Sequence, residues 1–162
     1  MQVACAHSVA SLYDRVAAML VDLHVGVVLD VGCADGVLRA ALSLSGPHLV
    51  GVDASAILLR DHPAPVVRAD TASLPFADDV FDAVTALNVF YHVPDPLSAL
   101  REAHRVLHAS GHLVVSAIAR DDSSELTTTG PARQQALTLR KHPAFSHKSS
   151  TRSLAIRGTR PW

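Results

Sequence analysis

Residues 29–36 read LDVGCADG, a short segment with two glycines that separates two stretches of different character. Residues 25–31 are almost entirely apolar and β-branched, which is typical of a strand buried on both faces. Residues 36–44 have the pattern of a helix that ends at the Ser-Gly-Pro of 45–47. Glycines at a strand-to-helix turn let the backbone turn sharply and approach a ligand closely. The segment therefore predicts the first βα unit of a parallel sheet, with a ligand at its turn.

The same alternation of apolar runs and helical patterns continues to residue 118. Apolar residues recur at helical spacing over 8–23, and Asp95 followed by Pro96 is typical of a helix start. The pattern predicts helices over residues 8–23, 36–44, 55–60 and 95–108, and strands over residues 25–31, 49–53, 66–69, 81–87 and 113–118. These elements predict an α/β fold built around a mostly parallel sheet.

Composition divides the 162-residue chain after Ile118. Residues 1–118 carry 6 Arg, no Lys and 12 Asp or Glu, a net charge of −6, whereas residues 119–162 carry 8 Lys or Arg and 3 acids, a net charge of +5. The second part lacks sustained periodicity, although residues 132–140 have the pattern of a short helix. Such a segment buries too little apolar area to offset its ordering entropy. We expect a compact core over 1–118 and a basic, largely disordered tail over 119–162.

Several classes of protein and site are disfavoured by the sequence. No apolar run approaches the roughly 20 residues that span a bilayer, and no secretory signal is visible. Two cysteines are too few for a disulfide scaffold, which favours a reducing compartment and a cytoplasmic protein. His104 and His108 share a helix face with charged neighbours but lack further ligands, so we expect no metal site. The near-zero total charge does not favour nucleic acid as a partner, although the basic tail leaves that alternative open.

The glycine spacing disfavours a dinucleotide cofactor. A dinucleotide-binding turn needs small residues at the first, third and sixth positions, counted here from Gly32. The sixth position is Val37, and the last glycine, Gly36, falls at the fifth. A nicotinamide-dependent oxidoreductase therefore stays a weaker alternative.

The chain resembles the class I S-adenosylmethionine-dependent methyltransferases, and most closely their type 11 methyltransferase domain. The first family motif, an acid followed by alternating glycines, falls on Asp30, Gly32, Ala34 and Gly36, with alanine where a glycine is usual. Further likeness lies in VGVD at 50–53, RADT at 68–71, LPFAD at 74–78, FDAV at 81–84, NVFYHV at 88–93, REAHRVL at 101–107 and GHLVVS at 111–116. The resemblance covers roughly residues 10–118.

The resemblance implies a Rossmann-like fold with strand order 3-2-1-4-5, in which the last two family strands are missing. The fifth strand would then be a bare sheet edge. It also implies methyl transfer from S-adenosylmethionine to a small-molecule acceptor. Because the C-terminal part departs from the family, a remnant that binds the cofactor without turnover is the alternative. The oligomeric state cannot be read from the sequence.

The same resemblance assigns the candidate site residues. The first motif, residues 30–36, would hold the methionine end of the cofactor, Asp53 the ribose hydroxyls and Asp70 the adenine amino group. Asn88 would contribute to cofactor binding, and both Asn88 and His92 would lie near the acceptor, where a histidine is a candidate general base. The structural alternatives are that the glycines only make a turn, that Asp53 and Asp70 only cap backbone turns, and that His92 only packs.

Overall fold

The computed structural model describes residues 3–42, 46–118 and 134–140. In chain order the elements are α1 (Val3–Asp22), β1 (Val27–Val31), α2 (Val37–Ala41), β2 (His48–Asp53), the 3₁₀ helix η1 (Leu58–Asp61), β3 (Val66–Arg68), β4 (Phe81–Leu87), α3 (Pro96–Val106), β5 (Leu107–Ile118) and β6 (Gln134–Arg140). Within these described residues, no helix has the length and apolar character needed to cross a membrane.

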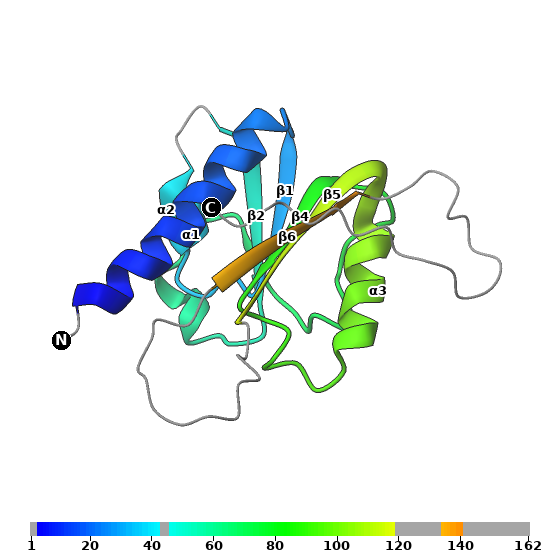
Figure 1. Ribbon diagram of the computed structural model, residues 1–162. Helices are drawn as coiled ribbons and strands as arrows, with labels where there is room; N and C mark the ends of the chain where they lie inside the picture. Colours follow the sequence, from blue (N-terminus) through cyan, green and yellow to red (C-terminus); the bar gives the residue numbers. More distant parts are fainter. Residues whose placement is uncertain (1–2, 43–45, 119–133, 141–162) are drawn as a thin grey trace, which may run out of the picture.

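The strands form a single sheet in the order β3-β2-β1-β4-β5-β6 (Figure 1). Neighbouring strands from β3 to β5 are parallel, which confirms the predicted α/β class and the order 3-2-1-4-5. The chain runs outward from β1 in one direction to β3 and then returns to β4 on the other side of β1. Ligands of open α/β sheets bind at the carboxyl ends of the strands where the order reverses, here between β1 and β4.

The sixth strand corrects two expectations about the C-terminal part. Residues 134–140 pair antiparallel with β5, from His112 opposite Arg140 to Ile118 opposite Gln134. The expected short helix over 132–140 is therefore wrong for 134–140, and β5 is not a bare edge. The sequence LTLR at 137–140 alternates apolar and polar residues, as strands do, and β5 supplies the backbone partners. The rest of the tail, residues 119–133 and 141–162, lies outside the described residues, so the division after Ile118 stays a prediction.

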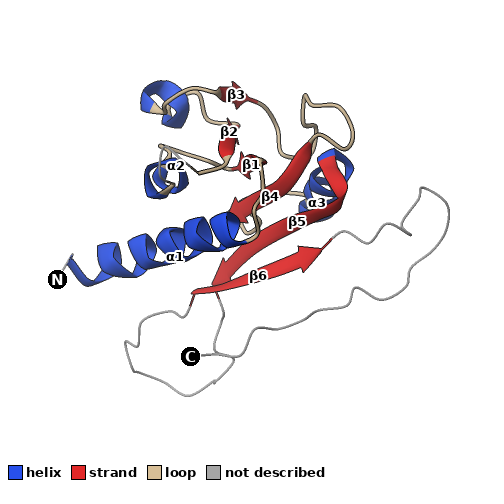
Figure 2. Ribbon diagram, turned by 90° about the horizontal axis from the view of Figure 1, so that it is seen from above, coloured by secondary structure: helices blue, strands red, loops and turns tan. Residues whose placement is uncertain are grey.

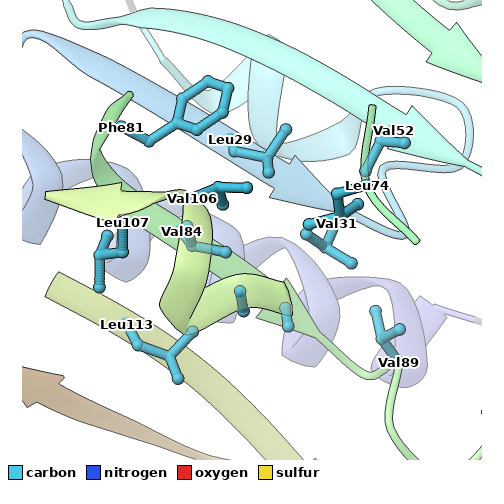
Figure 3. Close-up of a cluster of buried hydrophobic side chains, with 12 residues drawn as sticks. Leu29, Val31, Val52, Leu74, Phe81, Val84, Val89, Val106, Leu107 and Leu113 are labelled. Atoms are coloured by element: carbon cyan, nitrogen blue, oxygen red, sulfur yellow. The ribbon is translucent and has the colours of Figure 1, made fainter. Parts of the chain in front are cut away.

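Helices cover both faces of the sheet (Figure 2). Alternate residues of each strand face opposite sides of the sheet. On the face covered by α1 and α2, buried side chains of both helices pack against the strands; the central members are Leu12, Val16, Leu20, Leu38, Val28 and Ala83. On the α3 face, a second cluster joins the strands to the helix (Figure 3); its members include Leu29, Val31, Val84, Ala103, Val106 and Phe81.

The junction between α3 and β5 differs from the predicted helix end near His108. The helix ends at Val106, and Leu107 already pairs with Phe81 as the first residue of β5. The loop before β4 provides a hydrogen-bond donor for the carbonyl at the end of the helix, because Val80 N donates to Val106 O at 2.8 Å. The β4–β5 register then shifts before Ala83. A Cβ at Gly111 would lie 2.7 Å from the Leu107 side chain, so the irregular segment requires a glycine there.

Candidate functional site

The loop after β1 lies at the point where the strand order reverses. Its start is anchored on β2, because Gly32 N and Cys33 N both donate to Val52 O, at 2.7 and 3.1 Å. Gly32 and Gly36 have left-handed φ values of 70° and 91°. A Cβ at Gly32 would lie only 2.4 Å from Val89 Cγ2, on the loop after β4. Both the conformation and the close approach therefore require glycine at position 32.

Ala34 also adopts a left-handed conformation, with φ of 46°. A side chain in this region normally costs about 1–2 kcal/mol, so the loop holds local strain at the position where the family has glycine. The backbone N–H of Ala34 donates to Asp53 Oδ2 at 3.1 Å. This contact turns the amide toward the end of β2 and helps to hold the strained conformation.

Asp53 connects the ends of β1 and β2. Besides the bond from Ala34, its Oδ1 accepts a hydrogen bond from Ser55 N at 2.8 Å. The structure thus brings together the glycine loop and the carboxylate assigned to the ribose. It also shows the capping contact that the structural alternative describes. The two roles are compatible, since each carboxylate oxygen has a second lone pair.

Asp30 is buried beneath the loop, with 3% of its surface exposed. Its Oδ1 accepts a hydrogen bond from Thr85 Oγ1 at 2.7 Å, across the β1–β4 pair. Burial, and to a smaller extent the charge of Asp53, raises the pKa of Asp30 to about 7, against the opposing effects of the Thr85 hydrogen bond and the charge of Arg39. Asp30 therefore titrates near neutral pH.

Cys33 is buried between the loop and β2, where a Cβ at Gly51 would lie 2.7 Å from its sulfur. Burial raises the pKa of the Cys33 thiol to about 12, and the nearby charges of Asp30 and Asp53 act in the same direction. The thiol is therefore fully protonated at neutral pH.

A polar chain at the end of β4 includes two residues that sequence reasoning missed, Tyr13 and Ser116. Asn88, at φ of 60°, donates from its backbone N to Ser116 Oγ at 2.9 Å, and Ser116 Oγ donates to Asn88 Oδ1 at 3.2 Å. The Asn88 side chain also interacts with the Tyr13 hydroxyl of α1, which lowers the pKa of that hydroxyl. Burial and the charge of Asp30 raise the pKa of the Tyr13 hydroxyl above its ordinary value. The sequence signal that could have identified Tyr13 is a phenol among the apolar positions of the helix predicted over residues 8–23.

Asp70 lies on an exposed turn directly after β3. Its Oδ1 accepts from Ala72 N at 2.8 Å, and its carbonyl oxygen accepts from Ser73 N at 3.0 Å. The turn is tied to β2, because Ala69 N donates to Asp53 O at 3.1 Å. Asp53 and Asp70 thus lie on adjacent strand ends, although the contacts of Asp70 itself are those of a turn cap.

His92 is exposed, and the structure places it in a ring pair rather than against the cofactor residues. Its ring centroid lies 4.2 Å from that of Tyr91, which is 55% exposed. The backbone N of His92 donates to Val89 O at 2.9 Å, which closes a turn in the segment after β4. His104 and His108 are also exposed, and the described part of the chain contains no group of three metal-ligating side chains.

Comparisons with known proteins identify the family of the chain. A family model described as a methyltransferase domain matches residues 29–115, more than half of the chain. A ubiquinone biosynthesis O-methyltransferase from Alkalilimnicola ehrlichii is 32% identical over 123 residues, which cover 70% of this chain and 50% of that protein. A demethylmenaquinone methyltransferase from Mycolicibacterium paratuberculosis is 43% identical over 91 residues, which cover 54% of this chain and 40% of that protein.

Solved structures share the fold. A SAM-dependent methyltransferase from Thermotoga maritima matches with a TM-score of 0.59 at 23% identity, covering 70% of this chain and 54% of that one. The chain spans about half the length of the curated relatives it matches. From the matched domain, the strand order and the position of the glycine loop, we conclude that the chain belongs to the class I S-adenosylmethionine-dependent methyltransferases.

Proposed function

We propose that the chain binds S-adenosylmethionine at the ends of β1, β2 and β3 and transfers its methyl group to a small planar acceptor. The observation that carries this proposal is the 3.1 Å hydrogen bond from Ala34 N to Asp53 Oδ2. It joins the glycine loop to the carboxylate that we propose binds the ribose. An adenosyl group presents hydroxyl and amino donors, and the carboxylates of Asp53 and Asp70 are acceptors at adjacent strand ends. The residues present therefore fit the cofactor.

The chain's own part in the reaction is binding and orientation. When bound, S-adenosylmethionine supplies a methyl group that its positively charged sulfur already makes electrophilic. The carboxylate of Asp53, and that of Asp30 in its ionised form, contribute negative charge at the loop, which suits a cationic ligand. Holding an acceptor in line can supply roughly 7–11 kcal/mol of barrier reduction, so a dedicated base is not required. His92 is the candidate base for acceptors that must lose a proton.

The acceptor surface we propose is the exposed apolar group past the end of β4. Tyr91 and Leu97 are 55% and 57% exposed, and the His92 ring packs against Tyr91. Aromatic rings of this kind stack on planar ligands. The relatives named for ubiquinone and menaquinone biosynthesis support a quinone-type acceptor. The proposal includes a cytoplasmic site of action, in line with the two cysteines of the chain.

Calorimetry with S-adenosylmethionine and S-adenosylhomocysteine tests cofactor binding. We expect Asp53→Ala to weaken both by roughly 10- to 100-fold, since a partly buried carboxylate that would accept from two ribose hydroxyls is lost. Asp61→Ala removes an exposed carboxylate from η1 and serves as the matched control. Unchanged affinity in Asp53→Ala would remove that residue from the ribose role.

A methyl-transfer assay with quinols and other phenols tests turnover. His92→Ala should lower turnover of phenolic acceptors and leave the affinity for S-adenosylhomocysteine unchanged. The second candidate function is cofactor binding without catalysis, which is favoured because residues 119–162 lie outside the match to the family model. Tight binding with no turnover of any acceptor would select this second function.

A further inference from the structure

Two residues of α3 hold the loop that follows Asp70. The guanidinium of Arg105 donates from Nε and Nη2 to the two carboxylate oxygens of Glu102, each at 2.8 Å. Nη2 also donates to Leu74 O at 2.9 Å. Nη1 donates to Phe76 O at 2.7 Å and to Asp78 Oδ1 at 2.8 Å. All five N–H donors of the guanidinium are therefore used, four of them in partly buried hydrogen bonds.

Glu102 completes the attachment. Its Oε2 accepts a hydrogen bond from Leu74 N at 2.8 Å, so α3 holds both the N–H and the carbonyl of Leu74. The Leu74 side chain is 5% exposed and belongs to the cluster under α3. Arg105 and Glu102 are 26% and 20% exposed, and the Arg105 hydrogen bond holds the pKa of Glu102 below its usual range. The backbone and the side chain of Leu74 are thus both fixed.

This attachment lies one residue after the turn that carries Asp70. The turn closes through Ser73 N and Ala72 N, which donate to the carbonyl and the carboxylate of Asp70. At its other end, Ala69 N donates to the Asp53 carbonyl at 3.1 Å. The turn is therefore held by hydrogen bonds to β2 at one end and to α3 at the other. Releasing the α3 side would free Asp70 to move away from the adenine.

We propose that Arg105, together with Glu102, is a positioning residue that holds Asp70 in place to read the adenine base. The inference rests on the proposed function, because it presumes that an adenosyl group occupies the site. A lysine at position 105 would keep the charge, but it offers three donors on one nitrogen and cannot reach two carbonyls and two carboxylates together. Arg105→Lys is therefore a test of geometry rather than of charge.

The experiment compares S-adenosylhomocysteine with S-inosylhomocysteine, in which an oxygen replaces the adenine amino group. If Asp70 accepts from that amino group, the wild-type chain should bind the adenosyl compound roughly 10- to 100-fold more tightly. Calorimetry on Arg105→Lys should show this ratio falling to within about threefold of unity, mainly through weaker binding of the adenosyl compound. Arg101→Lys changes an exposed arginine on the same helix and should keep the wild-type ratio.

A general loss of stability would weaken both compounds alike, so the ratio separates positioning from a merely structural role. Hydrogen exchange adds a second readout: the Leu74 amide should be protected in the wild-type chain and exchange at least tenfold faster in Arg105→Lys. If Arg105→Lys does not fold, Glu102→Gln removes the carboxylate partner and should lower the ratio in the same way. A wild-type ratio retained in the folded variant would overturn the inference alone. Failure of the wild-type chain to bind either compound would instead overturn the proposed function and, with it, the inference.

Discussion

Replacing the buried acid of the glycine loop should change how the stability of the chain depends on pH. Asp30 has a folded-state pKa of about 7, against an ordinary value of 3.8, because it is buried next to Asp53. The folded chain keeps this proton while the unfolded chain releases it, so the contribution to stability is fully present below pH 3.8 and is lost as the pH rises through about 7. A shift of about three units corresponds to about 4 kcal/mol lost between pH 4 and pH 8.

Asp30→Asn keeps an oxygen that can accept from Thr85 and removes the titrating group. We expect urea unfolding, followed by far-UV circular dichroism, to give a free energy of unfolding for wild type that falls relative to the variant by about 1.4 kcal/mol per pH unit between pH 5 and pH 6.5. Above pH 8, Asp30→Asn should be the more stable protein by up to about 4 kcal/mol. Asp14→Asn removes an exposed carboxylate of α1 and controls for the change in net charge.

Parallel stability curves for wild type and Asp30→Asn would refute this reasoning, because they would show that Asp30 binds the same number of protons in both states. Thr85→Val sharpens the test. Since the Thr85 hydrogen bond lowers the pKa of Asp30, its loss should move the transition to higher pH. A transition that moves to lower pH in Thr85→Val would contradict the assigned hydrogen bond.

Three further substitutions test the loop and its surroundings by urea unfolding. Ala34→Gly should stabilise the chain by about 1 kcal/mol, because glycine adopts φ of 46° without strain; a loss of stability would argue against the left-handed conformation. Gly32→Ala should destabilise it by about 3 kcal/mol, since the new methyl meets Val89 at 2.4 Å, and a neutral effect would contradict that close approach. Tyr13→Phe should lower the free energy of unfolding by about 1 kcal/mol, because the interaction of the phenol with Asn88 is lost. Equal stability of the two proteins would contradict this role.

Much of the fold follows from patterns that are local in sequence. Buried parallel strands read as continuous apolar runs, so β1, β2 and β4 were predicted within two residues of their bounds. The proximity of Gly32 and Asp53 follows from parallel pairing, which brings the carboxyl ends of neighbouring strands to one edge. The strand predictions depend on patterns within a few neighbouring residues, and the proximity of Gly32 and Asp53 depends on one rule of sheet geometry.

Features that depend on distant partners could not be predicted from the sequence. Strand β6 forms because β5 offers it backbone partners, and no local signal identifies that pairing across residues 119–133. The bonds of Arg105 join residues 27 to 31 positions apart, and a charged residue on a helix carries no mark of such partners in the sequence. The contact of Tyr13 with Asn88 likewise depends on how α1 crosses the sheet.

The protonated sulfur of Cys33 has a chemical consequence for the proposed binding of a methyl donor. A thiolate is a strong nucleophile, whereas a neutral thiol is a poor one. With a pKa of about 12, Cys33 stays in the unreactive form throughout the physiological range, although it belongs to the very loop proposed to hold the methyl donor. If the loop holds the proposed methyl donor, burial of this side chain would keep the chain from being alkylated at Cys33.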